Sequence, residues 1–471
     1  MVLWGRVLRY VSTRGLAPAL TFEDVLLTGL ARDGGLYVPE LWPVFCKEEL
    51  LTLSRLSYPE LAIRVIRPFI GTTLTESELA DIVWNGCKNF RHPAVAPLKQ
   101  LDCNGWVCEL FHGPTLAFKD YALQFLGPLF DHILQQSGKR VVLVGATSGD
   151  TGSAAIEAFR DRAAVDVFVL HPHERVSSVQ RRQMTTVQAD NIHNIAVTGT
   201  FDDCQALVKR LLNDVPFRES MNLSAVNSIN WGRLIAQVVY YFWSALAIGG
   251  CSRQIAFAVP TGNFGNVFAG YVARAMGLPV SRFVIGSNCN DILTRFFATG
   301  TMSVRPVVPT LSPSMDIQVS SNFERLLFEM YNRDGAIVER LMTQFQETGV
   351  FSVANNCKQE IRDLFCGFAL NDDETKATMA EVYTTTGALV DPHTAIGIAA
   401  ARASLVRSEM PVITLSTAHP AKFPLATREA TGQEAVLPAH LDNLFVCEER
   451  FIVLPADLAV VQQYIRLHAR R

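Results

Sequence analysis

Residues 141–152 read VVLVGATSGDTG, and residues 255–266 read IAFAVPTGNFGN. Each stretch opens with a short apolar run, passes through a turn that contains glycine, and continues into a segment with helical spacing. Short apolar runs bounded by turns are typical of buried parallel strands, which are joined by helices. Two strand-turn-helix units in one chain therefore predict an α/β fold.

Other apolar runs extend this pattern along the chain. Further strands are predicted at residues 165–170, 283–285 and 412–415, and helices at residues 153–159, 202–213 and 267–276. This alternation is expected of an α/β sheet with helices on both faces. Because ligands of such sheets bind beyond the carboxyl ends of the strands, the two glycine turns are candidate ligand loops.

The N-terminal part of the chain has a different character. Residues 10–90 are helical and amphipathic in pattern, with turn signals at residues 33–35 and 57–59. One helix is predicted at residues 76–85, with Thr75 as its N-cap. A helical segment that precedes the α/β pattern predicts a separate N-terminal cap domain.

The composition argues against several classes of function. Of 471 residues, 49% are hydrophobic and 18% are charged, which suits a chain with two or three buried cores. A net charge of -3 leaves no basic excess to attract nucleic acid or an anionic membrane surface. No apolar run is long enough to span a bilayer, and the first residues do not resemble a signal peptide. The ten cysteines lack a C-x-x-C spacing, so reduced thiols, a cytoplasmic location and no metal site are expected.

The glycines of the second turn indicate an anion site. Gly262 and Gly265 permit close approach of the backbone, and the helix that follows adds its positive dipole end. Neither turn has the G-x-G-x-x-G spacing of dinucleotide sites or the Gly-Lys-Ser/Thr ending of a P-loop. Taken alone, each turn is also compatible with a connection that binds nothing.

A single lysine stands in the segment ELFHGPTLAFKDY, residues 109–121. Lys119 follows apolar residues on the way into a helical stretch. Desolvation disfavours an ammonium, so a lysine in such surroundings can become a nucleophilic amine for a carbonyl cofactor. A surface lysine at the start of a helix is the alternative for this segment by itself.

Together, these segments resemble threonine synthase of the bacterial and fungal type, a family of fold-type II pyridoxal-phosphate enzymes. The resemblance runs nearly from end to end, through seven segments in order: residues 10–15, 33–37, 112–120, 146–152, 227–231, 260–266 and 417–423. It implies a fold like that of the tryptophan synthase β subunit, with two three-layer α/β domains and an N-terminal helical cap domain.

The resemblance also implies domain boundaries. The cap domain takes residues 1–95, and a large cofactor-binding domain combines residues 96–140 with residues 225–425. A smaller, mobile α/β domain takes residues 141–224, and residues 426–471 form a C-terminal segment. The smaller domain is expected to close over the substrate, because water that arrives at the wrong moment diverts the reaction.

The cofactor implied by the family is pyridoxal 5'-phosphate, and its residues carry over by position. Lys119 occupies the Schiff-base position and is the catalytic residue that moves protons. The turn at residues 262–266 cradles the cofactor phosphate, and a small hydroxyl residue lies near the pyridine nitrogen. The implied cofactor-binding residues are Lys119, Gly262, Asn263, Phe264, Gly265, Asn266 and Thr417.

The implied substrate-binding residues are Thr147, Ser148, Asp150, Thr151, Asn230 and Arg233. Related enzymes often have Asn where this chain has Asp150, so Ser148 and Thr151 are the better donors to the substrate carboxylate. Asn230 and Arg233 lie in a region that resembles a substrate-phosphate site. His419 lies within a matched segment, and its position is compatible with packing around the cofactor or with proton transfer.

The activity implied by the resemblance is the conversion of O-phospho-L-homoserine and water into L-threonine and phosphate. The cofactor serves as an electron sink for the carbanion-like steps. Two alternatives stay open: a phospho-lyase that releases 2-oxobutyrate from the same substrate, and a protein that binds the cofactor without catalysis. A monomer or a homodimer that acts on a small molecule, with no nucleic acid or membrane partner, is expected.

Overall fold

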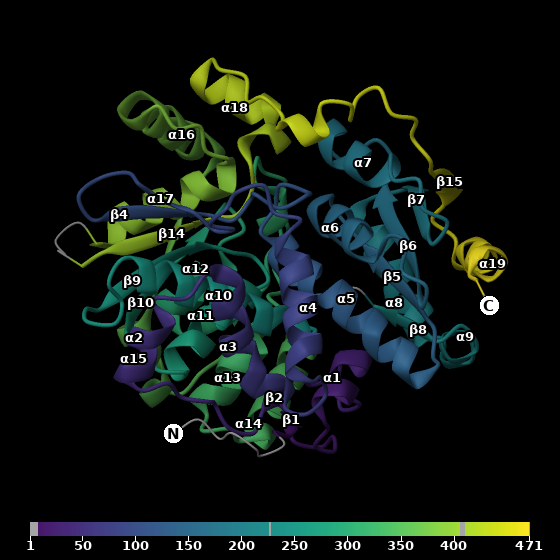
Figure 1. Cartoon of the computed structure of the whole chain (residues 1–471), viewed down its shortest axis with the longest axis horizontal. Helices are drawn as coiled ribbons and strands as arrows, with labels where there is room; N and C mark the ends of the chain where they lie inside the picture. Colours follow the sequence, from purple (N-terminus) through teal and green to yellow (C-terminus); the bar gives the residue numbers. More distant parts are fainter. Residues whose placement is uncertain (1–7, 226–227, 406–409, 471) are drawn as a thin grey trace. The chain divides into compact units, whose positions relative to one another are not determined.

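The computed structural model describes residues 8–225, 228–405 and 410–470 (Figure 1). Contacts between residues divide the chain into two compact units. The first unit comprises Met1–His112 and Ser228–Ala435, and the second comprises Gly113–Asn227 and Val436–Arg471. The predicted domains were defined by function, as a part that binds the cofactor and a part that moves. Their boundaries stay a prediction.

The first unit is built on a six-stranded sheet with the order β13-β10-β9-β14-β4-β3. Its strands are β3 (Leu98–Gln100), β4 (Gly105–Glu109), β9 (Ile255–Pro260), β10 (Val280–Ser287), β13 (Phe365–Ala369) and β14 (Val412–Ser416). Neighbouring strands are parallel, except that β3 pairs antiparallel with β4. The strands predicted at residues 255–259, 283–285 and 412–415 are confirmed.

Helices cover both faces of this sheet, as the alternation of its side chains requires. On one face, Ala256, Ala258 and Val284 pack against α17 (Pro392–Leu405). On the other face, Phe257 and Phe283 contact Tyr241 of α10 (Trp231–Ala247), which packs on α11 (Gly265–Ala275). Successive residues of a strand point to opposite faces, so two buried faces explain the continuous apolar runs.

The N-terminal residues differ in part from the prediction. The helices are α1 (Phe22–Thr28), α2 (Lys47–Leu53), α3 (Tyr58–Ile70) and α4 (Glu76–Cys87), and Thr75 forms the predicted capping box with Glu78. The helical assignment is wrong for β1 (Tyr10–Ser12) and β2 (Tyr37–Pro39), which pair antiparallel, and the turn at residues 33–35 precedes β2. Strands of three residues are too short to show a period of two, which explains the error. The signal at residues 57–59 is the start of α3, with Ser57 as the N-cap.

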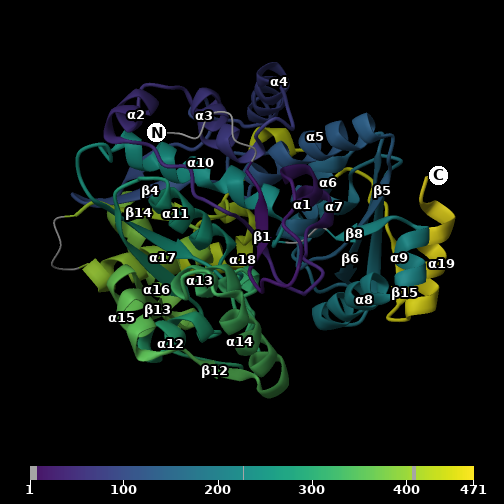
Figure 2. The same ribbon diagram turned by 90° about the horizontal axis from the view of Figure 1, so that it is seen from below.

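The remaining helices and strands of the first unit lie between β10 and the end of α18. The strands β11 (Thr301–Ser303) and β12 (Val350–Ser352) form an antiparallel pair, and Figure 2 shows β12 beside α14 (Gly335–Thr348). The others are α12 (Ile292–Thr299), η1 (Pro313–Met315), α13 (Phe323–Met330), α15 (Asn355–Leu364), α16 (Asp372–Thr386), η2 (Pro420–Lys422) and α18 (Pro424–Thr431).

The second unit is built on a five-stranded parallel sheet with the order β15-β7-β6-β5-β8. Its strands are β5 (Val141–Ala146), β6 (Val165–Pro172), β7 (Ile192–Thr198), β8 (Leu223–Ala225) and β15 (Ile452–Pro455). Its helices are α5 (Lys119–Ser137), α6 (Asp150–Phe159), α7 (Ser178–Thr185), α8 (Phe201–Asn213), α9 (Val215–Ser220), η3 (Ala439–Leu441) and α19 (Leu458–His468). The predicted strands at residues 141–144 and 165–170 and the helices at residues 153–159 and 202–213 are confirmed.

One face of this second sheet is covered partly by the C-terminal segment. Val144, Phe168 and Val197 share a buried core with Leu207 of α8 and Val461 of α19. Helices α5 and α6 pack against each other, and α6 contacts β6. Each unit is therefore a three-layer arrangement of helices around a mainly parallel sheet. Within the described ranges, no helix combines the length and hydrophobicity needed to cross a bilayer.

Candidate active site

Lys119 is the first residue of α5 and is largely enclosed. Its Nζ lies 3.2 Å from Asp150 Oδ2, and the two side chains are 12% and 4% exposed. The same Nζ lies 5.1 Å from the centre of the Phe118 ring. The positive end of α5 repels an ammonium at this position, whereas the Asp150 carboxylate attracts it. Both of these influences on Lys119 come from residues of the second unit.

The segment before Lys119 is fixed by a buried carboxylate. Asp120 accepts hydrogen bonds from the backbone N of Thr115, at 2.9 Å, and from Thr115 Oγ1, at 2.7 Å. Leu116, between them, has a φ of 62°. These bonds hold the loop that delivers Lys119 to the start of its helix.

The turn after β5 is closed by its own side chains. Thr147 Oγ1 accepts hydrogen bonds from the backbone N of Gly149 and of Gly152, each at 2.9 Å. Gly149 has a φ of 134°, and a Cβ there would lie 2.6 Å from Gln180 Cδ. Asp150, the first residue of α6, also accepts a hydrogen bond from Gln180 Nε2, at 2.8 Å. Asp150 therefore bridges the turn, α7 and Lys119.

Ser148 and Thr151 are the two half-buried hydroxyl residues of this turn. Among the described residues, neither side chain has a hydrogen-bond partner, in contrast to Thr147. Both hydroxyls are therefore able to donate to a ligand. The substrate-binding roles of Thr147, Ser148, Asp150 and Thr151 stay predictions.

The turn after β9 is held by hydrogen bonds of the residues that flank it. Thr261 Oγ1 donates to Asn266 Oδ1, at 2.6 Å, and accepts from the backbone N of Phe264, at 3.2 Å. Phe264 adopts a φ of 63° and forms the N-cap of α11. Asn266 Nδ2 donates to the carbonyl of Pro260, at 3.1 Å. The side chains thus brace the turn without using most of its amide groups.

Four amide N–H groups of this turn have no acceptor within the part of the chain that the structure describes. They belong to Gly262, Asn263, Gly265 and Asn266. Unpaired N–H groups at the start of a helix form an anion site, because they add their dipoles to that of the helix. These donors suit a phosphate group, so the residues present fit the phosphate of the expected cofactor.

Two residues that the sequence analysis missed support this turn. Ser320 Oγ donates to the carbonyl of Gly262, at 2.7 Å, and Asn322 Nδ2 donates to the carbonyl of Asn263, at 3.1 Å. A Cβ on Gly265 would lie 3.2 Å from Asn322 Nδ2. No local signal marks these residues, because they lie 58 and 59 residues away from their partners.

Thr417 follows the end of β14 and is 6% exposed. In the described ranges, its hydroxyl has no hydrogen-bond partner. The neighbouring Ser416 Oγ lies 3.0 Å from Thr394 Oγ1, which bonds to the buried Asp391. Of these two adjacent residues, Thr417 is the one whose hydroxyl is available, and it is the residue predicted to bond to the cofactor ring. That role stays a prediction.

His419 lies close to Thr417 in the sequence and is held in place by packing. Its Nδ1 accepts a hydrogen bond from the backbone N of Ala421, at 3.1 Å, and its ring meets that of Phe111 edge to face. Burial lowers the pKa of His419 to about 4. A neutral, packed imidazole favours the packing alternative over proton transfer near neutral pH.

The region around Asn230 is organised by buried hydrogen bonds. Asn230 Oδ1 accepts from the backbone N of Gly232, at 2.9 Å, and Nδ2 donates to the carbonyl of Leu26, at 2.8 Å. Arg233 is 5% exposed, and burial lowers the pKa of its guanidinium to about 10. Arg233 therefore remains a buried cation at neutral pH, and its substrate role stays a prediction.

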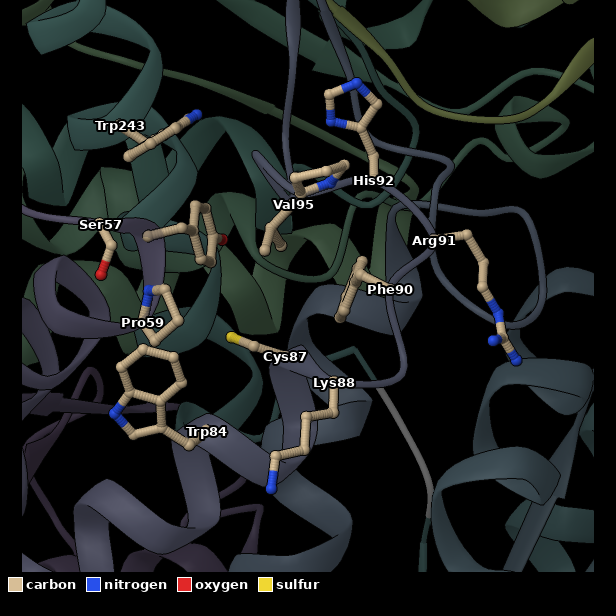
Figure 3. Close-up of a pocket in the computed structure, with 12 residues that line it drawn as sticks. Ser57, Pro59, Trp84, Cys87, Lys88, Phe90, Arg91, His92, Val95 and Trp243 are labelled. Atoms are coloured by element: carbon tan, nitrogen blue, oxygen red, sulfur yellow. The ribbon is translucent and has the colours of Figure 1, made fainter.

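A cavity of about 480 Å³ opens elsewhere in the first unit (Figure 3). Its walls include the aromatic side chains of Tyr58, Trp84, Phe90 and Trp243. The side chain of Arg91 extends away from the two tryptophan rings. None of the predicted site residues lines this cavity. The described residues also contain no group of three or more side chains that could hold a metal ion.

Comparison with known proteins identifies the family. A model described as "Threonine synthase N terminus" matches residues 9–87, "Pyridoxal-phosphate dependent enzyme" matches residues 90–417, and "Threonine synthase, C-terminal" matches residues 394–465. The chain is 55% identical to a threonine synthase of Pseudomonas aeruginosa, over 98% of this chain and 99% of the relative. The chain belongs to the threonine synthase family.

Solved structures of the threonine synthase family agree with this assignment. A pyridoxal-phosphate-bound threonine synthase from Brucella melitensis is 50% identical, with a TM-score of 0.96 over 98% of this chain and 100% of that chain. The yeast threonine synthase is 38% identical, with a TM-score of 0.93 over 98% of each chain. The predicted family, the fold-type II fold and the cofactor are confirmed, and the chain is a pyridoxal-phosphate-dependent enzyme.

Proposed function

We propose that this enzyme converts O-phospho-L-homoserine and water into L-threonine and phosphate. The observation that carries the proposal is the 55% identity to a protein named threonine synthase over 98% of the chain. The available donors at the turn after β9 and the enclosed Lys119 support it, because the chemistry requires both an anchored cofactor and a movable proton. The enzyme is proposed to act in the cytoplasm as a monomer or a homodimer.

The cofactor is proposed to be held by residues that the sequence analysis named. Lys119 Nζ attaches it covalently, and the N–H groups of Gly262, Asn263, Gly265 and Asn266 receive its phosphate. Phe264 sets the turn through its positive φ, and the Thr417 hydroxyl bonds to the ring nitrogen. When bound, the cofactor withdraws electrons from the substrate and so makes its C–H bonds acidic enough to ionise.

Lys119 is proposed to carry the protons of the reaction. Its free Nζ would take a proton from Cα of the substrate and would later move protons at Cβ. Asp150, 3.2 Å from Nζ, holds the ammonium that results. Because Gln180 donates to the other oxygen of Asp150, that carboxylate keeps its orientation while the charge on Lys119 changes.

The substrate is proposed to be held at its two anionic ends. The hydroxyls of Ser148 and Thr151 donate to the carboxylate, and Thr147 keeps their turn closed. Arg233 supplies a buried positive charge for the phosphate group, and Asn230 fixes the start of the helix that carries it. Residues 141–224 are proposed to move, because water has to be excluded until the phosphate has left.

The proposal is tested by incubating the cofactor-loaded enzyme with O-phospho-L-homoserine and measuring phosphate, threonine and 2-oxobutyrate together. Equal amounts of phosphate and threonine are expected. Equal amounts of phosphate and 2-oxobutyrate would identify a phospho-lyase instead. A preparation that holds the cofactor and releases neither product would identify a protein that binds the cofactor without catalysis.

A further inference from the structure

A second cavity, of about 480 Å³, lies entirely within the second unit. Val141 and Val142 begin β5, Asp166 is the second residue of β6, and Asn222 directly precedes β8. These strands are parallel, so the cavity opens at the amino edge of the sheet. The turn at residues 147–152 follows the carboxyl end of β5, about 20 Å away along a strand of six residues. The cavity is therefore distinct from the candidate active site.

Three arginines and one carboxylate line this cavity: Arg140, Arg466, Arg470 and Asp166. Three positive charges and one negative charge leave a local excess of two positive charges. The whole chain has a net charge of -3, so this excess is a local feature. Positive charges gathered around one cavity attract an anion more strongly than scattered surface arginines do.

Asp166 already forms an ion pair with Arg470. Arg470 Nε donates to Asp166 Oδ1, at 2.6 Å, and the backbone N of Arg470 donates to Oδ2, at 3.1 Å. Arg470 Nη2 also donates to the carbonyls of Arg162 and Val165, at 2.9 and 2.7 Å. The Asp166 side chain is 2% exposed, so it is not free to turn toward another cation.

Arg140 and Arg466 keep unused donors. Arg140 Nη2 lies 3.7 Å from Asp166 Oδ2, which is longer than a hydrogen bond. Arg140 Nε and Nη2 are shielded from solvent and have no hydrogen-bond acceptor among the described residues. Arg466 is exposed and lies 5.2 Å from the centre of the Phe217 ring, and its guanidinium has no protein acceptor in the described part of the chain, so its donors are open to solvent and to a ligand. A shielded N–H group without an acceptor costs free energy, and such groups commonly bind an ion or water.

We infer that this cavity is a binding site for a phosphate group, either inorganic phosphate or a small phosphate monoester. Guanidinium groups match the oxygens of phosphate with paired N–H donors, and the ring beneath Arg466 holds its plane in place. Val141, Met221 and Ala469 form apolar wall that suits the organic part of an ester. The site is independent of the proposed substrate, because none of the residues assigned to catalysis lines it.

Protection from arginine modification tests the site directly. The cofactor-loaded enzyme is treated with phenylglyoxal at constant ionic strength, and peptides are mapped by mass spectrometry. Inorganic phosphate is expected to slow modification of Arg140 and Arg466 about twofold at a concentration equal to Kd, and about tenfold at ten times Kd. Arg210, an exposed arginine of α8 outside the cavity, is the control and is expected not to change. Equal slowing of Arg210, or no slowing of Arg140, would overturn the inference.

A matched pair of variants tests the site by a second readout. Arg140→Gln removes the charge and keeps much of the side-chain length, and Arg210→Gln makes the same change outside the cavity. Phosphate is expected to raise the Tm of the wild-type and Arg210→Gln holoenzymes by the same amount, and to raise that of Arg140→Gln by less. An unchanged shift in a folded Arg140→Gln holoenzyme would show that phosphate stabilises the protein elsewhere. If Arg140→Gln fails to fold, the protection of Arg140 from phenylglyoxal in the wild-type enzyme decides whether phosphate binds in this cavity.

Repeating the protection with glycerol phosphate distinguishes the two sources of the phosphate group. Protection at a lower concentration than inorganic phosphate requires would identify an ester, whose organic part uses the apolar wall. Protection by inorganic phosphate alone would identify the free ion. Protection by neither compound would contradict the inference.

Discussion

The turn after β5 and the turn after β9 have similar sequences but different uses of their amide groups. In the first, Thr147 binds two backbone N–H groups, and the carboxylate of Asp150 stands at the start of the helix. In the second, four N–H groups have no acceptor among the described residues, and no acidic residue lies in the first turn of α11. The N–H groups of Ser148 and Thr151 in the first turn also lack an acceptor among the described residues, so the two turns differ in the acidic residue at the helix start and in how many donors their own side chains bind.

We infer that the two turns have different tasks. Asp150 already supplies the negative charge that the start of α6 favours, so that turn is suited to proton chemistry with Lys119. The turn after β9 is suited to holding a phosphate. Substitutions can separate these tasks. A change in the turn after β5 should affect turnover, and a change in the turn after β9 should affect cofactor retention.

The largest effect is expected from Lys119→Ala, which removes both the attachment point and the proton carrier. Turnover should fall by about 10³-fold or more, because general acid-base catalysis alone contributes that much. In the wild-type enzyme, borohydride should fix the cofactor to the peptide that contains Lys119. An adduct on another lysine, such as Lys422, would contradict the assignment of this residue.

The next largest effect is expected from Gly265→Asp in the turn after β9. The new carboxylate should repel the cofactor phosphate and neutralise the positive end of α11, so cofactor affinity should fall by about 2 kcal/mol, or about 30-fold. Gly265→Asn is the control, because it adds similar volume beside Asn322 without the charge. Equal cofactor affinity in the wild type and Gly265→Asp, measured by equilibrium dialysis, would show that this turn is only structural.

A smaller effect is expected from Asp150→Asn, and it should fall on turnover rather than on cofactor affinity. Gln180 and Lys119 both donate to the Asp150 carboxylate, whereas the amide of Asn has a single acceptor oxygen, so one of the two bonds is lost at a cost of about 1 kcal/mol. We expect kcat to fall about fivefold to tenfold and cofactor affinity to stay within twofold. If cofactor affinity fell as much as kcat, the division of tasks between the turns would be wrong.

Among the residues placed at the cofactor, Thr417→Val is expected to have the smallest effect on cofactor binding. This change keeps the shape and removes one neutral hydrogen bond, which is worth about 0.5–1.5 kcal/mol. Turnover should fall further than binding, because the bond matters most where charge develops on the ring. Absorption spectra and threonine formation would be measured on the same preparation. Full turnover would mean that Thr417 only packs, and that Ser416 or a backbone group serves the ring.

The strands that carry both turns could be predicted because their signals are local. An apolar run between turns marks β5 and β9, and the capping box at Thr75 marks the start of α4. The antiparallel pair β1 and β2 was missed because three residues show no period. The charged residues that brace the site were missed for another reason.

Those bracing residues act over long distances in the sequence. Arg325 donates to the carbonyl of Ile229, 96 residues away, and so fixes the segment that leads to Asn230. Glu324, the neighbour of Arg325 in α13, accepts a hydrogen bond from Thr13 Oγ1, 311 residues away, at 2.6 Å. In the sequence these look like ordinary charged residues, because only the fold brings their partners close. Lys119 was recognisable because the segment around it matches a known family.

The C-terminal segment gives the second unit an unusual order of assembly during synthesis. Strand β15 pairs with β7, and Val461 and Ile465 of α19 are fully buried in the same core as Val144 and Phe168. On the ribosome, the residues up to Asn227 emerge long before Val436–Arg471. The nascent unit therefore exposes part of one apolar face of its sheet while residues 228–435 are being translated. A chaperone that binds nascent apolar surfaces would have this face as its target until α19 arrives.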